Sequence, residues 1–187
     1  MERDIKLVIF DLDGTLVHLP VKYEKLREEI SRILGINKVD SILAALANLD
    51  GDLKMKIFDI WSWLELEALP DLREIDEGIR IYNRFYGKIR CLVTLQGKMV
   101  VDRILEKTGL SFDYIVTREN SLSRSEQIRM VIEKFKVDPR EILVVGDRES
   151  DREAAERFGC KLILVKNRNP NGGEYSLEES YNRDRDG

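Results

Sequence analysis

We predict an α/β fold, in which a doubly wound parallel β-sheet carries a helical unit inserted after its first strand. Three observations on the 187-residue chain support this prediction. Short apolar runs recur along the chain, and they are nearly continuous rather than alternating, as in strands that helices cover on both faces. Segments with helical period separate the later runs, and a much longer helical stretch separates the first two.

Five apolar runs indicate buried parallel strands, at residues 5–10, 89–94, 114–117, 142–145 and 162–165. Between the last four strands, apolar residues recur on one face of three predicted helices. These helices end before Gly109, before Asp138-Pro139 and before Gly159. The repeated strand–helix order is typical of a doubly wound sheet.

The stretch between the first two strands is too long for one crossover helix, and we expect no strand in it. Apolar spacing predicts a helix up to Gly35, a second after the Asp40-Ser41 cap, a third stopped by Pro70 and a fourth that ends near Gly87. We therefore predict a helical cap over residues 19–87 and an α/β core formed by residues 1–18 and 88–187. Residues 168–187 are expected to form a polar tail of this core.

The composition favours chemistry on small molecules. A net charge of −4 and a sequence pI near 5.3 provide no basic surface for nucleic acid or for an anionic membrane. Cys91 and Cys160 lie in no metal-binding pattern, and His18 is the sole histidine, which argues against zinc sites and histidine-based triads. We find no signal peptide and no apolar stretch of membrane-spanning length, so a cytoplasmic location is the default expectation.

Acidic residues follow two of the predicted strands directly. Asp11-Leu12-Asp13-Gly14-Thr15 comes after the first strand, and Gly146-Asp147 begins a second acidic stretch that ends at Asp151. Asp-Gly is also a common turn pair, so the first motif alone would fit a turn equally well. The recurrence at two strand ends favours a site, because ligands of open α/β sheets bind at the carboxyl ends of the strands.

These acids are suited to a divalent cation. Asp11 and Asp147 supply the hard oxygen ligands that Mg²⁺ prefers, and a bound cation would compensate the mutual repulsion of the carboxylates. Thr94 ends a third strand and is expected to converge on the same place.

With these motifs the sequence resembles the haloacid dehalogenase-like hydrolase superfamily, and in particular its phosphatase branch of phosphoglycolate phosphatase-like proteins. The resemblance rests on DLDGTLV from Asp11, on the strand end at Thr94, and on the GDxxxD stretch ending at Asp151. It covers the whole α/β core, and the insertion corresponds to the helical cap of that family. It implies a Rossmann-like core and a Mg²⁺-dependent phosphatase.

The resemblance also implies roles for the acids. Asp11 would be the nucleophile that forms an aspartyl-phosphate, and Asp13 would be the general acid and base. Asp11, Asp147 and the backbone carbonyl of Asp13 would hold the Mg²⁺. Asp151 would be a second acid of the metal site, either as a further ligand or as an outer-shell partner.

Phosphate-binding groups are implied as well. Thr94 would hydrogen-bond a phosphoryl oxygen, together with the backbone N–H groups of Leu95 and Gln96. The family normally places a lysine in its third motif, where this chain has Arg124, which can also neutralise charge during transfer. Lys98 is the alternative cation.

The predicted activity is hydrolysis of a small phosphorylated metabolite. A phosphomutase of the same superfamily and a regulatory protein that binds a phosphorylated ligand with weakened turnover remain alternatives. A dehalogenase is disfavoured because a halide leaving group needs neither a proton from Asp13 nor a metal. We expect no nucleic-acid or membrane partner, and the sequence leaves the oligomeric state open.

Overall fold

The computed structural model describes residues 4–166, which form two compact units. The first contains the chain up to Leu19 and from Leu69 onward, and the second is Pro20–Ala68. The sequence analysis extended the inserted helical segment to residue 87, whereas the structure places residues 69–87 in the first unit. The predicted tail, 168–187, lies outside the described residues.

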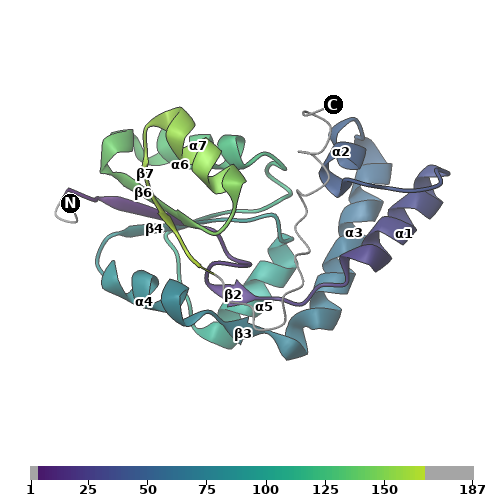
Figure 1. Cartoon of the computed structure of the whole chain (residues 1–187), viewed down its shortest axis with the longest axis horizontal. Coiled ribbons are helices and arrows are strands. Elements are labelled where there is room, and N and C mark those ends of the chain that lie inside the picture. The colour runs from purple at the N-terminus through teal and green to yellow at the C-terminus, as the bar shows by residue number, and fades with distance from the viewer. Residues whose placement is uncertain (1–3, 167–187) are drawn as a thin grey trace. The chain divides into compact units, whose positions relative to one another are not determined.

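The first unit is built on a five-stranded parallel sheet in the order β5-β4-β1-β6-β7 (Figure 1). Its strands are β1 (Leu7–Phe10), β4 (Ile89–Val93), β5 (Tyr114–Val116), β6 (Ile142–Gly146) and β7 (Lys161–Leu164). The chain proceeds from β1 in one direction through β4 and β5, and then returns to the other side of β1 with β6 and β7. This reversal confirms the predicted doubly wound fold, and it places the topological switch point between β1 and β6.

Helices lie on both faces of this sheet (Figure 1). On one face are α6 (Arg124–Phe135) and α7 (Glu149–Phe158), and on the other are α4 (Asp76–Arg84) and α5 (Lys98–Thr108). Two short 3₁₀ turns, Leu69–Asp71 and Pro139–Glu141, complete the unit. Because both faces are covered, the strands are mostly apolar, which is why they appear as nearly continuous runs in the sequence.

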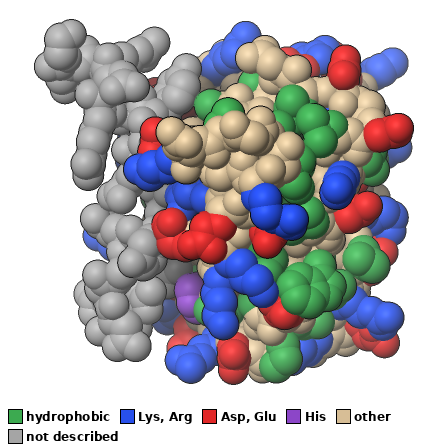
Figure 2. All heavy atoms as spheres, turned by 90° about the vertical axis from the view of Figure 1, so that its right-hand side faces the viewer, with side chains coloured by type: hydrophobic (Ala, Val, Ile, Leu, Met, Phe, Trp, Pro, Cys, Tyr) green, Lys and Arg blue, Asp and Glu red, His purple; other side chains and the backbone are tan. Residues whose placement is uncertain are grey.

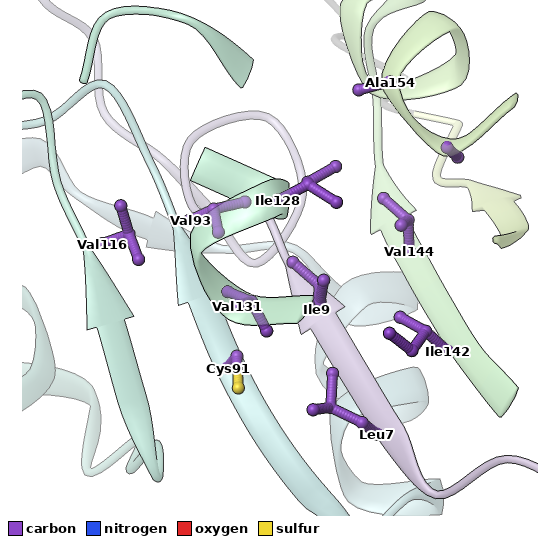
Figure 3. Close-up of a cluster of buried hydrophobic side chains, with 11 residues drawn as sticks. Leu7, Ile9, Cys91, Val93, Val116, Ile128, Val131, Ile142, Val144 and Ala154 are labelled. Carbon is purple, nitrogen blue, oxygen red and sulfur yellow. The ribbon is translucent and has the colours of Figure 1, made fainter. Parts of the chain in front are cut away.

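The main core lies between the sheet and the helices α6 and α7 (Figure 3). Alternate residues of β1, β4 and β6 point to this face and meet apolar side chains of α6 such as Ile128 and Val131. On the opposite face, the Phe10 ring lies 5.7 Å from the Tyr82 ring of α4. This contact helps to hold α4 on the sheet, and with it part of the segment that we had expected in the cap.

A two-stranded ribbon that the sequence analysis missed lies just after the acidic motif. β2 (Val17–His18) pairs antiparallel with β3 (Arg73–Glu74), and the Ile75 N–H donates to the Leu16 carbonyl at 2.9 Å. Gly78 of α4 packs so closely on the Thr15 carbonyl that a Cβ atom there would lie well under 3.0 Å from it. The loop behind the first acidic motif is thereby fixed by α4.

The second unit consists of α1 (Tyr23–Leu34), α2 (Ile42–Ala47) and α3 (Gly51–Ala68). Helix α1 packs against α3, where Lys25 lies 3.4 Å from Glu67 and over the Trp63 ring. Helix α1 ends at Gly35, which has a positive φ of 67°, and α2 begins after the Ser41 cap, both as predicted.

No helix within residues 4–166 is long and apolar enough to cross a bilayer. Lys and Arg side chains mingle with Asp and Glu on the face drawn in Figure 2.

Candidate active site

Two adjacent strands of the sheet end in acidic residues. Asp11 follows β1 and Asp147 follows β6, and the register pairs Phe10 with Val145. The Asp11 N–H continues this pairing, donating to the Val145 carbonyl at 2.9 Å. The two acids therefore lie side by side at the switch point of the sheet, where ligands of such folds bind.

Asp151 joins these two acids from the first turn of α7. Asp11, Asp147 and Asp151 each offer a carboxylate oxygen, and these oxygens lie within 4.8 Å of one another. Asp11 and Asp151 are buried, and the Asp147 side chain retains 17% of its exposure. The structure thus brings together residues that the sequence separates by up to 140 positions.

Burial strongly perturbs the ionisation of these carboxyls. It raises the pKa of Asp11 to about 7, with Asp151 and Asp147 adding to the rise and Arg124 opposing it. Burial likewise raises the pKa of Asp147 to about 6, opposed mainly by Arg148. The positive charge of the protein therefore does not fully compensate the cluster. Closely spaced, under-compensated carboxylate oxygens fit a small divalent cation, so the donor set suits Mg²⁺.

Arg124 reaches into the cluster from the start of α6. Its Nη2 donates to Asp11 Oδ1, and its Nε lies 2.8 Å from Asp151 Oδ1. Burial alone would lower the pKa of the guanidinium, but Asp11 and Asp151 outweigh it and the pKa is raised. Arg124 therefore stays charged beside Asp11 and Asp151.

Lys98, the alternative cation, lies elsewhere. It begins α5, its side chain is 71% exposed, and its Nζ contacts Asp102 at 2.6 Å. Among the two cations considered from the sequence, the structure therefore brings Arg124 and not Lys98 to Asp11.

Asp13 is buried, and its carboxylate is hydrogen-bonded to the backbone of the chain. Its Oδ1 accepts a hydrogen bond from the Leu19 N–H at 2.8 Å. Burial raises the pKa of its carboxyl, whereas Arg148, the Leu19 hydrogen bond and His18 oppose the rise. A raised pKa favours the protonated form of a carboxyl, which is the form that a general acid needs.

Thr94 directly follows β4, on the other side of β1 from Asp147. Its N–H donates to the Val116 carbonyl at 3.0 Å, and its Oγ1 lies between the backbone N–H of Gln96, at 3.2 Å, and the Gln96 side-chain amide oxygen. Arg124 Nη1 donates to the carbonyl of Val93, directly before Thr94, at 2.7 Å. The predicted phosphate-binding segment, Thr94 with Leu95 and Gln96, is thus linked to the cation that holds Asp11.

The structure also reveals residues to which the sequence analysis gave no role. Thr15 is buried, and its Oγ1 donates to Asp147 Oδ1 at 3.3 Å. Gln127 is buried one helical turn after Arg124 and bonds to it. Gln127 could have been recognised in the sequence, because it is a polar residue on the face of α6 that points to the core. The contact of Thr15 with Asp147 is visible only in the folded structure.

Residues 8–165 match the protein family described as haloacid dehalogenase-like hydrolase. The chain is 25% identical over 186 residues to pyrophosphatase PpaX of Bacillus pumilus, covering 88% of this chain and 84% of that protein. It is 26% identical over 192 residues to a phosphoglycolate phosphatase of Vibrio parahaemolyticus, covering 85% and 82%. A solved haloacid dehalogenase-like family hydrolase from Streptococcus pneumoniae has the same fold, with a TM-score of 0.63, 16% identity, and 88% and 86% of the chains covered.

Proposed function

The chain belongs to the haloacid dehalogenase-like hydrolases, and we propose that it is a Mg²⁺-dependent phosphatase that hydrolyses a small phosphorylated metabolite. The observation that carries this proposal is the pairing of Asp11 with Arg124 inside the carboxylate cluster. A buried carboxylate at a strand end, held by one cation among other acids, is suited to attack phosphorus while charge builds up on the transferring group. The names of the phosphatase relatives add support for this reaction class.

In the first step, an oxygen of Asp11 attacks the phosphorus of the monoester and the bond from phosphorus to the ester oxygen breaks. Asp13 gives its proton to the departing oxygen, which leaves as the alcohol, and the phosphoryl group remains on Asp11 as an acyl phosphate. In the second step, water attacks this phosphorus and gives a proton to Asp13. Inorganic phosphate leaves, and both carboxyls return to their starting state.

Asp11, Asp147 and the Asp13 carbonyl would hold the Mg²⁺, which when bound neutralises charge on the phosphoryl oxygens. Asp151 fits the outer-shell alternative better, because its two oxygens already meet protein groups. Its Oδ2 accepts from the Arg148 N–H at 3.2 Å, and its Oδ1 lies at Arg124 Nε. Thr94 and the N–H groups of Leu95 and Gln96 would bind the phosphoryl oxygens beside Arg124.

The direct test is phosphate release from 4-nitrophenyl phosphate and from a panel of phosphorylated metabolites, with Mg²⁺ and with EDTA. We expect Mg²⁺-dependent turnover that Asp11→Asn abolishes without unfolding the protein. Acid-quenched protein should carry phosphate on Asp11 during turnover. Turnover by Asp11→Asn, or a pure folded wild type that releases no phosphate from any substrate, would refute the proposal.

A further inference from the structure

Gln127 is a buried polar residue on a helix face that otherwise contributes to the core. Its neighbours on α6, Ile128 and Val131, are fully buried in the main apolar cluster. Gln127 has no exposed surface, and a buried amide is costly unless its hydrogen bonds are made. The hydrogen-bond partners of this side chain therefore indicate why a polar residue is buried here.

The Gln127 amide joins two parts of the candidate active site. Its Oε1 accepts from Arg124 Nη1 at 2.9 Å, and its Nε2 donates to the carbonyls of Thr94 at 2.7 Å and Ser121 at 2.9 Å, with the Thr117 carbonyl at 3.4 Å. This surrounding fixes the orientation of the amide. If it were flipped, its oxygen would face carbonyl oxygens and its NH₂ would face the guanidinium.

The Arg124 guanidinium, in turn, contacts an oxygen atom at each of its nitrogens, and the contact of Nε with Asp151 is an ion pair rather than a hydrogen bond. Nη2 and Nε face Asp11 and Asp151, whereas Nη1 donates to the Val93 carbonyl at 2.7 Å and to Gln127. The two acceptors at Nη1 fix the rotation of the planar group, so they determine where Nη2 and Nε point. A lysine at this position would have no equivalent of Nη1.

From this geometry we infer that Gln127 is a positioning residue, which holds the guanidinium of Arg124 in register with Asp11 and Thr94. The inference builds on the proposed phosphatase function. In that reaction Arg124 stabilises the phosphoryl group between the nucleophile and the phosphate-binding segment, so its orientation matters most in the transition state. The arginine in the third motif is thus one half of a pair, and its orientation depends on Gln127.

The first experiment replaces Gln127 with methionine, which keeps the length of the side chain and removes both polar ends. We expect kcat for 4-nitrophenyl phosphate to fall by roughly ten- to a hundredfold, with a smaller change in KM. Val131→Ala is the matched control, because it truncates a buried residue of the same helix that makes no bond to Arg124. Equal losses of kcat in the two variants, at equal losses of thermal stability, would overturn the inference.

A double-mutant cycle tests the pairing itself. In an Arg124→Lys background, adding Gln127→Met should change kcat by less than about twofold, because the bond to Nη1 is already gone. Effects that multiply fully in the double variant would show that Gln127 acts independently of Arg124, and would overturn the inference.

A third measurement does not depend on activity. In ¹⁵N-arginine-labelled protein, the Arg124 Nε–H signal is assigned by its loss in Arg124→Lys, and its hydrogen exchange is measured. We expect faster exchange in Gln127→Met than in wild type or Val131→Ala. Unchanged exchange would overturn the inference whatever the activity, whereas faster exchange in a protein without turnover would support it and refute the proposed function alone.

Discussion

Gly14 lies directly against the carboxylate of Asp147. A Cβ atom at position 14 would stand less than 3.0 Å from both oxygens of that carboxylate, and it would be much closer to Oδ2 than to Oδ1. The residue also has a φ of +91°, a conformation that side chains with a Cβ rarely adopt. The first acidic motif thus requires glycine for two separate reasons, its backbone conformation and the closeness of a residue from another strand end.

Gly14→Ala should therefore weaken metal binding as well as folding. The added methyl group must displace the Asp147 carboxylate, so we expect calorimetry to show a clear loss of Mg²⁺ affinity. Gly109→Ala is the control, because its φ of +72° imposes a similar backbone strain while a Cβ there meets nothing within 4 Å. Both variants should lose about 1–2 kcal/mol from the backbone strain. Full Mg²⁺ affinity in Gly14→Ala would contradict the placement of Asp147 in the metal site.

Asp147→Asn should lower Mg²⁺ affinity by more than roughly tenfold, a loss that even an outer-sphere change can produce. Asp151→Asn should have the smaller effect, because the oxygens of Asp151 already contact Arg124 and the Arg148 N–H. Titration calorimetry with MgCl₂ at fixed pH compares the two variants. A larger loss for Asp151→Asn would make Asp151 the direct ligand.

Arg124→Met should destabilise the metal-free protein by about 3–5 kcal/mol, the usual cost of removing one partner of a buried ion pair. It would leave Asp11 and Asp151 without the cation that they share. Urea unfolding in EDTA measures this loss, and saturating Mg²⁺ should recover part of it. Exposed Arg103→Met, which breaks only a surface pair with Glu106, is expected to cost less than about 1 kcal/mol.

The metal-free protein should become less stable as the pH rises from about 4 to 7. In the folded state the pKa of Asp11 is raised to about 7 and that of Asp147 to about 6, both from an ordinary value of 3.8. Within this window the folded state binds more protons than the unfolded chain, so deprotonation favours unfolding. Thermal unfolding in EDTA should show the decline, and Asp147→Asn should show a shallower one. An equally steep decline in the variant would contradict the role of Asp147.

Much of the fold could be predicted because its signals are local. Helix α1 ends where it was predicted to end, since Gly35 stops it in a left-handed conformation, and the five strands match their apolar runs within two residues at each end. The ribbon of β2 and β3 was missed because two-residue strands carry no periodicity. The placement of α4 differed because an amphipathic pattern does not reveal which unit the helix packs on. Here the Tyr82 ring contacts Phe10 of the sheet.

Some features of the candidate site could likewise be predicted from the sequence, and others could not. The meeting of Asp11 with Asp147 follows from sheet topology, because both residues end neighbouring strands. The contact of Gly14 with Asp147 and the bonds of Gln127 depend on distances of a few ångströms across the fold. No spacing in the sequence encodes those distances.

The ribbon of β2 and β3 has a consequence for how this chain can be re-engineered. The ribbon brings the segment before Leu19 next to the segment after Leu69. The inserted segment Pro20–Ala68 therefore begins and ends at neighbouring points of the first unit. We expect that replacing this inserted segment with one of different length would leave the strand pairings and the carboxylates of the first unit in place. Chimaeras could therefore vary the inserted helical unit while the scaffold that carries the carboxylates keeps its own sequence.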